Sequence, residues 1–282
     1  MKRGIAAFLL FCLLFGASGC NWLGYGYRWA DELIYFKLDQ YFDLNDEQEN
    51  QLKPQIHQAV LWHKKNQLPL YEAFVTQIDE AAASGMTLAK LQAIFGRWAE
   101  LREALLSKLV APSASFLATT STAQQQRLQS KLTEENKKLL AQLELPEAER
   151  RRVRIEWLTE TLEDWVGSLN SQQTETLTEF VSNLPLQEEL WIQSRLDRQT
   201  LFFEGLKQPS TRSLEALLLH LWVEVYRMDN SAEGQQRRAG QAAYHQLLLT
   251  LYQQMDPKQQ VTLHEQLLDF KATLAELQEL DD

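Results

Sequence analysis

Apolar residues recur every three or four positions along most of the chain. In residues 87–109, TLAKLQAIFGRWAELREALLSKL, they occupy positions 88, 91, 94, 95, 98, 101, 105 and 109. This spacing places apolar side chains on one face of an α-helix. Similar stripes run through residues 153–166, 190–206, 214–226 and 244–255. The pattern predicts amphipathic helices that bury one face against each other.

The predicted helices follow one another with short connections. The first covers about residues 27–41, and the second begins at Asn45, with Pro54 kinking or dividing it. The others are expected at residues 69–84, 87–110, 121–143, 146–168, 170–183, 185–206, 210–228, 233–254 and 256–279. No β-branched residues alternate over a strand length, so we predict an all-α, multi-helix bundle of about nine to eleven amphipathic helices.

The domain organisation follows from these short connections. Loops are expected around residues 82–85, 110–115, 207–210 and 229–234, and none has the length or composition of a disordered linker. We therefore treat residues 20–282 as one helical domain, with a soft internal boundary near residues 110–120.

A short motif recurs four times at identical offsets. A hydrophobic or Thr residue precedes Asn, Ser or Asp; Gln follows three positions later, and Leu four positions after that. Such a residue followed by Gln forms a capping box, in which the two side chains satisfy backbone N–H groups of the first helical turn. The eight predicted capping residues are Asn45, Gln48, Ser121, Gln124, Asn170, Gln173, Asp256 and Gln259.

The recurrence of this motif resembles the L-T-x-x-Q signature of periplasmic helical proteins of the Spy and CpxP type. That resemblance implies ATP-independent, chaperone-like or envelope-stress functions. It covers short motifs only, and this chain has Asn, Ser or Asp where those proteins usually have Thr.

Longer stretches resemble an uncharacterised family of proteobacterial lipoproteins over most of the chain. They are YFDL (41–44), WHKKNQLPLY (62–71), PSASFLATTSTAQ (112–124), ENKKL (135–139), RRRVRIEWLTETLEDWVGSLNSQQ (150–173) and WIQSRLDRQTLFFEGL (191–206). The resemblance implies a helical fold in the bacterial cell envelope, and it implies no established activity.

The first nineteen residues have the pattern of a lipoprotein signal peptide. Lys2 and Arg3 precede an apolar stretch too short to span a bilayer, and small residues lead into Cys20. We expect Cys20 to carry the lipid, and Asn21 after it favours the outer membrane facing the periplasm. The only other cysteine, Cys12, lies within the signal, so the mature chain has no intramolecular disulfide.

Aromatic residues follow Cys20 closely. Trp22, Tyr25, Tyr27 and Trp29 lie where many lipoproteins have a polar tether. They either pack on the hydrophobic core or lie at the membrane interface, where Trp and Tyr are enriched. Both alternatives place the folded part of the protein close to the bilayer.

The charge balance argues against a nucleic-acid partner. Removing Lys2 and Arg3 from 28 basic residues leaves 26 against 38 acidic ones, a net charge of −12 for the mature chain. The exception is a basic cluster in which Arg150, Arg151 and Arg154 are candidate contacts for an anion or a partner. The alternative is a solvated face paired with neighbouring glutamates.

No pattern typical of catalysis or metal binding occurs. No two of the five histidines stand three or four residues apart, and no nucleophile or phosphate-loop motif is present. We therefore expect no enzyme activity, no metal and no cofactor. The sequence favours a lipid-anchored periplasmic protein that binds proteins or unfolded clients without ATP. The alternative is a structural or assembly lipoprotein of the envelope with a dedicated partner.

Overall fold

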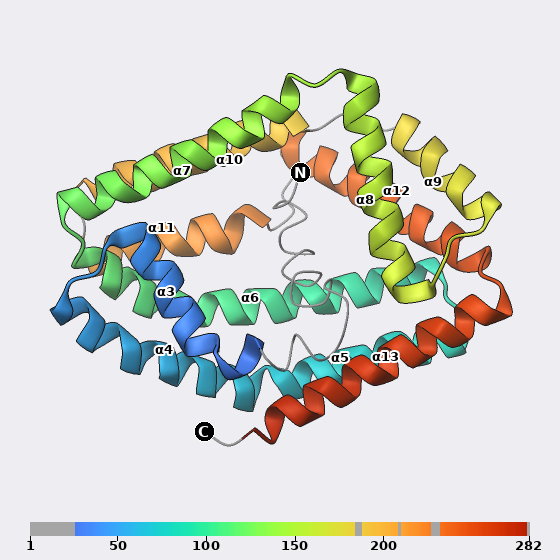
Figure 1. The fold of residues 1–282 in the computed structure, drawn as a ribbon, viewed down its shortest axis with the longest axis horizontal. Helices are drawn as coiled ribbons and strands as arrows, with labels where there is room; N and C mark the ends of the chain where they lie inside the picture. Colours follow the sequence, from blue (N-terminus) through green and yellow to red (C-terminus); the bar gives the residue numbers. More distant parts are fainter. Residues whose placement is uncertain (1–25, 184–187, 208–209, 227–231, 281–282) are drawn as a thin grey trace.

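The computed structural model describes residues 26–183, 188–207, 210–226 and 232–280, in which the chain forms eleven α-helices and no strand (Figure 1). The predicted all-α, multi-helix fold is confirmed. Cys20, Trp22 and Tyr25 lie outside the described residues. The helices are α3 (Ala30–Phe42), α4 (Asp46–Asn66), α5 (Leu68–Ala83), α6 (Leu88–Ala118), α7 (Thr122–Leu143), α8 (Glu147–Val166), α9 (Ser171–Asn183), α10 (Glu188–Leu206), α11 (Thr211–Trp222), α12 (Ala232–Gln253) and α13 (Pro257–Gln278), with a 3₁₀-helix, η1 (Glu224–Tyr226), after α11.

The predicted loop at residues 110–115 is wrong. α6 continues through it to Ala118 with Pro112 inside the helix. A proline inside a helix removes one backbone hydrogen-bond donor and tends to kink or break the helix. Here the residues before and after Pro112 on the buried face of α6 pack against other helices. Val110 and Ala114 are buried in one hydrophobic cluster with α11 and α7 residues. Tertiary packing therefore maintains the helix against the local preference.

The chain forms two halves, α3 to α7 and α8 to α13, in which corresponding helices follow one another in the same order. In the first half, α3 contacts α4 and α7, and α4 contacts α6; in the second, α8 contacts α9 and α13, and α9 contacts α12. Figure 1 shows the two halves related by an approximate two-fold axis, with α3 and α4 opposite α8 and α9. α6 and α11 run through the middle of the molecule and contact each other.

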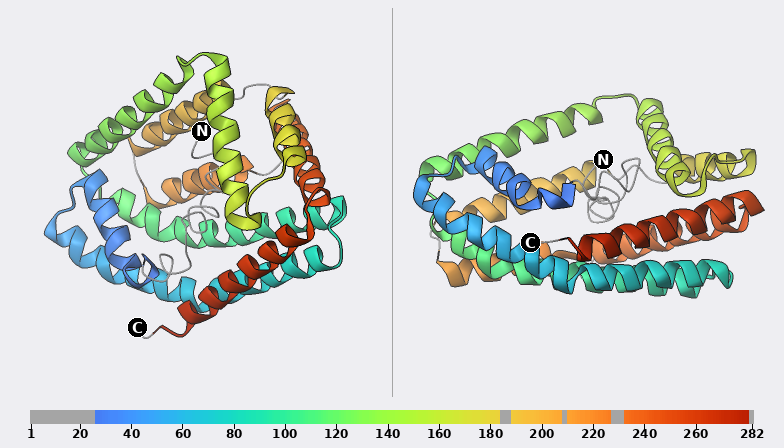
Figure 2. Two further views of the ribbon diagram at one scale, coloured as in Figure 1. Left: turned by 45° about the vertical axis from the view of Figure 1, so that its right-hand side comes forward. Right: turned by 60° about the horizontal axis from the view of Figure 1, so that its bottom comes forward.

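The last helix of each half packs on the other half. α7 contacts α10, and α13 contacts α5, which gives two exchanged helix pairs on opposite sides of the molecule (Figures 1 and 2). The largest core cluster lies at the second pair, where Tyr71 and Phe74 of α5 pack with Phe270 and Leu274 of α13. None of the described helices has the length and hydropathy needed to cross a membrane.

Candidate functional site

The first two copies of the recurrent motif meet in space. At the start of α4, Asn45 Oδ1 accepts from Gln48 N at 2.9 Å, and Gln48 Oε1 accepts from Asn45 N at 3.3 Å. At the start of α7, Gln124 and Ser121 form the same capping box. The two buried glutamine amides then bond each other: Gln124 Nε2 donates to Gln48 Oε1 at 2.6 Å, and Gln48 Nε2 donates to Gln124 Oε1 at 3.2 Å.

The other two copies also meet, in the second half, through a single bond between their glutamine amides. Asn170 and Gln173 bond reciprocally at the start of α9, and Asp256 and Gln259 form the capping box of α13. Gln259 Nε2 donates to Gln173 Oε1 at 2.8 Å, while Gln173 Nε2 donates to the carbonyl of Leu251 at 3.2 Å.

Each motif glutamine therefore has two roles. Its Oε1 atom satisfies a backbone donor at its own helix start, and its side chain bonds the glutamine of another helix start 76 or 86 residues away; Gln173 Nε2 donates instead to Leu251 near the end of α12. The similar separation of the two pairs is the one signal in the sequence that could have indicated this pairing. The residue types and full pairing indicate joints between helices, with no group left to act on a substrate.

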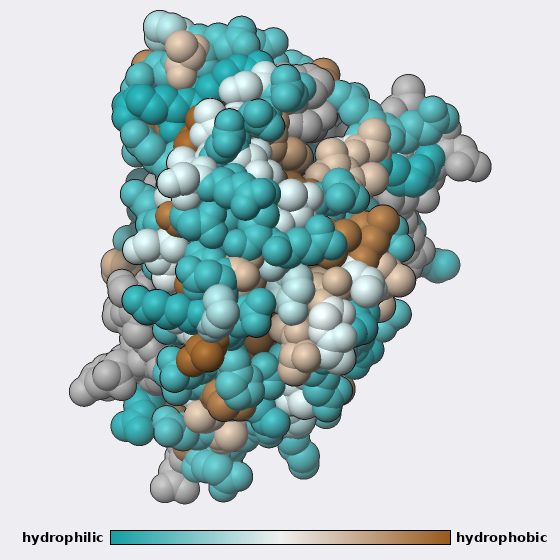
Figure 3. All heavy atoms as spheres, turned by 90° about the vertical axis from the view of Figure 1, so that its right-hand side faces the viewer, coloured by the Kyte–Doolittle hydropathy of each residue, from teal (hydrophilic) through white to brown (hydrophobic). Residues whose placement is uncertain are grey.

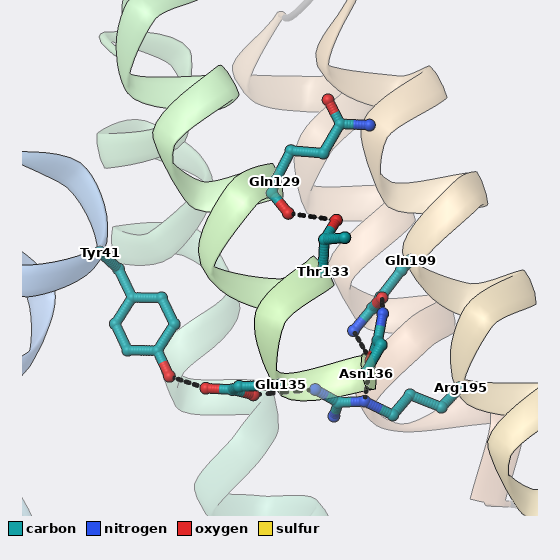
Figure 4. A network of polar contacts seen from close by, with 7 residues as sticks. All are labelled: Tyr41, Gln129, Thr133, Glu135, Asn136, Arg195 and Gln199. Atoms are coloured by element: carbon teal, nitrogen blue, oxygen red, sulfur yellow. Dashed lines mark hydrogen bonds and ion pairs between the residues drawn. The ribbon is translucent and has the colours of Figure 1, made fainter. Parts of the chain in front are cut away.

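A second polar network joins α3, α7 and α10 (Figure 4). The Tyr41 hydroxyl donates to Glu135, and Arg195 NH2 donates to the other oxygen of that carboxylate at 3.0 Å. Arg195 Nε also donates to Asn136 Oδ1 at 2.9 Å, and Asn136 Nδ2 donates to Gln199 Oε1 at 2.6 Å. No local pattern in the sequence predicts a role for these residues, although all five lie in stretches that carry the lipoprotein resemblance.

This network, which we call the Glu135 network, consists of Tyr41, Glu135, Asn136, Arg195 and Gln199. Glu135 accepts from a phenol and a guanidinium at once, and hydrogen bonds with a charged partner are stronger than neutral ones. Asn136 is buried and bonded on both of its amide atoms. The arrangement connects three helices, two from the first half and one from the second.

Two of the candidate arginines converge on one buried carboxylate. Glu188, the first residue of α10, has a side chain only 9% exposed. Arg150 NH1 lies 3.8 Å and Arg154 NH1 3.5 Å from its oxygens, and both arginines project from α8. Among the described residues, no donor makes a hydrogen bond to either Glu188 oxygen. The attraction at this position is therefore electrostatic and connects α8 with α10.

The other arginines of the basic cluster contact acidic or carbonyl groups. Arg151 bonds Glu147 and the carbonyl of Val181 on α9, and Arg152 pairs with Glu149 and Glu156 on its own helix. Arg152 is exposed, whereas Arg151 is partly buried. The structure thus places all three candidate residues, Arg150, Arg151 and Arg154, beside acidic side chains of the chain itself.

An aromatic cluster surrounds His63 near the end of α4. The ring of His63 lies against Tyr27 and Tyr71, and the Tyr27 hydroxyl lies 3.0 Å from His63 Nδ1. Burial lowers the pKa of His63 to about 4 and raises the pKa of Tyr71 to about 12. His63 is therefore a neutral packing residue at pH 7. Of the aromatic residues after Cys20, Tyr27 packs on the core, whereas Trp29 is exposed.

The described surface offers little that resembles a reaction centre. Within the described ranges, no three His, Cys, Asp or Glu side chains lie close enough to hold a metal ion. A hollow beside α9 is lined by Leu169, Ser171, Thr174, Glu175, Thr178 and Glu179, and it is open to solvent. The face over α8 and α9 is largely hydrophilic, with apolar residues in small separated patches (Figure 3).

Comparison with known proteins gives a family without an assigned role. Residues 40–227 match the model of a family of unknown function, DUF6279. No curated protein and no solved structure matches the chain. The matched range contains the Glu135 network, the first three copies of the recurrent motif and the arginine cluster with Glu188.

Proposed function

Since the chain belongs to DUF6279, a family of unknown function, we propose its role from its structure: a lipid-anchored helical protein of the bacterial envelope that binds a protein partner without catalysis. In this proposal Cys20 carries the lipid, and the folded part faces the periplasm from the outer membrane. The resemblance to envelope lipoproteins and the signal-like N-terminus support the location.

The proposal rests on one observation: the buried polar groups bond to each other and connect helices. This holds for the Glu135 network, for the two glutamine pairs, and for Glu188 with Arg150 and Arg154. A catalytic centre instead needs a nucleophile or base that faces a space for substrate. A frame fixed by such joints supports a role in presenting a surface of constant shape to a partner.

The distribution of exposed apolar side chains favours one dedicated partner over many unfolded clients. Outside α3, the large exposed apolar residues are spread over several helices with at most two on any one, such as Leu140 on α7, Leu190 and Leu201 on α10, and Val261 and Leu268 on α13. A surface for unfolded chains is expected to be a contiguous apolar patch. Chaperone-like binding of clients remains the second candidate, favoured by the recurrent motif that resembles Spy-type proteins.

The lipid anchor is tested by replacing Cys20. We expect Cys20→Ala to leave an unprocessed or soluble product, since no other cysteine follows in the chain. The matched control is Ser18→Ala, which keeps a small residue before the cysteine. Unchanged membrane association and processing of Cys20→Ala would contradict the anchor.

The binding mode is tested by two measurements on one preparation. Cross-linking of the lipidated protein in envelopes should yield one constant partner, which mass spectrometry identifies. In parallel, the mature protein with Cys20→Ser is mixed at equal molar amounts with several unrelated denatured proteins. We expect no protection from aggregation; protection of most of them, without a constant cross-linked partner, would favour the chaperone-like role instead.

A further inference from the structure

α3 carries an exposed apolar stripe at its outer face. Trp29, Leu33 and Phe36 are 58%, 53% and 57% exposed. They stand at i, i+4 and i+7, so they follow one another along a single side of the helix. Leu33 N donates to the Trp29 carbonyl at 2.9 Å, which joins Trp29 to the first turn. Figure 1 shows α3 on the near side of the molecule, in front of α4.

The opposite side of α3 is fixed to the body of the protein. The Tyr35 hydroxyl donates to Glu49 at 2.8 Å, and Asp31 lies 2.6 Å from His57 Nδ1, both on α4. At the end of the helix, Phe42 is buried, and Tyr41 belongs to the Glu135 network. These contacts set the rotation of α3, so the apolar stripe cannot turn inward to be covered.

Charged residues of both signs flank the stripe: the basic Arg28 and Lys37, and the acidic Glu32, which is also exposed. Arg28 and Lys37 are both exposed, and Lys37 Nζ lies 5.1 Å from the ring of Tyr41. A helix with Trp, Leu and Phe on one side and basic residues beside them is typical of segments that lie in the plane of a membrane interface. The basic groups can contact lipid phosphates while the rings enter the boundary with the acyl chains.

The short segment between Cys20 and α3 limits how far the apolar stripe can lie from a lipid attached at Cys20. Tyr27 is held against His63, and Cys20 precedes Tyr27 by seven residues. Seven residues reach at most about 25 Å when fully extended. The stripe begins at Trp29, two residues after Tyr27. A lipid at Cys20 therefore keeps the start of α3 within a short distance of the bilayer.

We infer that α3 docks on the membrane surface, with Trp29, Leu33 and Phe36 inserted at the interface of the lipid headgroups and acyl chains. The inference rests on the proposed lipid anchor at Cys20. The lipid holds the protein at the bilayer, while α3 sets its orientation and turns the remaining surface toward the periplasm. Membrane contact also accounts for three large apolar side chains that no described part of the chain covers.

The test uses the lipidated full-length protein in phosphatidylethanolamine and phosphatidylglycerol vesicles that carry a nitroxide-labelled lipid. Because the lipid occupies Cys20, one introduced cysteine is the only free thiol of the mature chain, and it receives an environment-sensitive fluorophore. Phe36→Cys reports on the stripe. Leu201→Cys is the matched control, since Leu201 is 44% exposed on α10, which lies behind α7 in Figure 1.

We expect the nitroxide lipid to quench the label at position 36 about threefold more strongly than the label at position 201. Trp29→Ser with Leu33→Ser should reduce this difference while the protein stays on the vesicles. Equal quenching at both positions in vesicle-bound protein would overturn the docking of α3 and leave the anchor intact. Failure of the protein to float with vesicles would instead contradict the proposed function.

A second copy of the chain is the other occupant that this test distinguishes. If α3 paired with α3, Phe36→Cys molecules would form a disulfide-linked dimer under mild oxidation, and the label would be shielded without vesicles. That result would also overturn membrane docking.

Discussion

At the scale of single residues, the motif glutamines explain why one short pattern recurs in this chain. An N3 glutamine would cap its own helix wherever it stood, and each such cap contributes about 1 kcal/mol. Here Gln48, Gln124, Gln173 and Gln259 are also buried, so each amide needs partners beyond its own helix start. Pairing two caps satisfies both amides and fixes the relative position of two helix starts.

The glutamine pair can be measured by a double-mutant cycle. We expect Gln124→Ala to lower the free energy of unfolding by about 2 kcal/mol, because it removes a cap and leaves Gln48 short of partners. Combining it with Gln48→Ala should cost less than the sum of the two, with a coupling of about 1 kcal/mol. Urea unfolding measures all variants, and exposed Gln126→Ala on the same helix is the control. Strictly additive losses would contradict the pairing.

His63 makes stability depend on pH in a defined range. Burial lowers its pKa from 6.5 to about 4, so between these values the unfolded chain binds more protons than the folded one. The free energy of unfolding should therefore fall as the pH decreases from 6.5 to 4. At about 1.36 kcal/mol per pKa unit, the full loss from this residue is roughly 3 kcal/mol.

The contribution of His63 can be separated from that of the carboxylates by substitution. We expect His63→Gln to be less stable than the wild type at pH 7 but to lose less stability on acidification. The measurement is urea unfolding at several pH values between neutral and about pH 4.5. His264→Gln is the control, since that histidine lies on the surface of α13 with its side chain 54% exposed. Equal pH dependence of the His63 variant and the wild type would refute this assignment.

At the scale of helices, the contact between α8 and α10 depends on one carboxylate. We expect Glu188→Gln to destabilise the protein by about 2 kcal/mol, because partly buried Arg154 would lose its acidic partner and Arg150 would keep only the exposed Glu189. Glu189→Gln is the matched control, since its side chain is 72% exposed and lies 4.0 Å from Arg150. Thermal unfolding compares the two variants. If both changed the midpoint equally, Glu188 would have no special role.

The helices also show how much of the fold could be predicted from the sequence. Apolar periodicity predicted the all-α fold, and most predicted helix bounds lie within two residues of the observed ones, as at α7 and α13. Capping residues act locally, so their offsets could be read directly. Pro112 led to the wrong prediction of a loop, because the burial of Val110 and Ala114 outweighs the tendency of proline to end a helix. Single bonds of the Glu135 network join residues up to 94 positions apart, and only the packing of α3, α7 and α10 brings them together.

At the scale of the whole molecule, the exchange of α7 and α13 makes the halves depend on each other. The first half contributes α5, whose buried residues Leu68, Tyr71 and Phe74 belong to a cluster completed by α13 of the second half. The second half contributes α10, which is covered by α7 and connected to it by the Glu135 network. A half produced alone would expose the apolar face that its counterpart covers.

This dependence predicts the behaviour of a chain divided between α7 and α8. We expect fragments of residues 26–144 and 145–282 to show reduced helicity and no cooperative unfolding when produced singly, because each lacks the helix of the other half that covers its apolar face. Mixed together, they should recover the circular dichroism spectrum of the intact chain and elute as one complex. The control is the intact chain cleaved at a protease site inserted in residues 144–146, which should stay associated. Two fragments that each unfold cooperatively alone would show that the halves are independent domains, and the exchanged helices would then add little to folding.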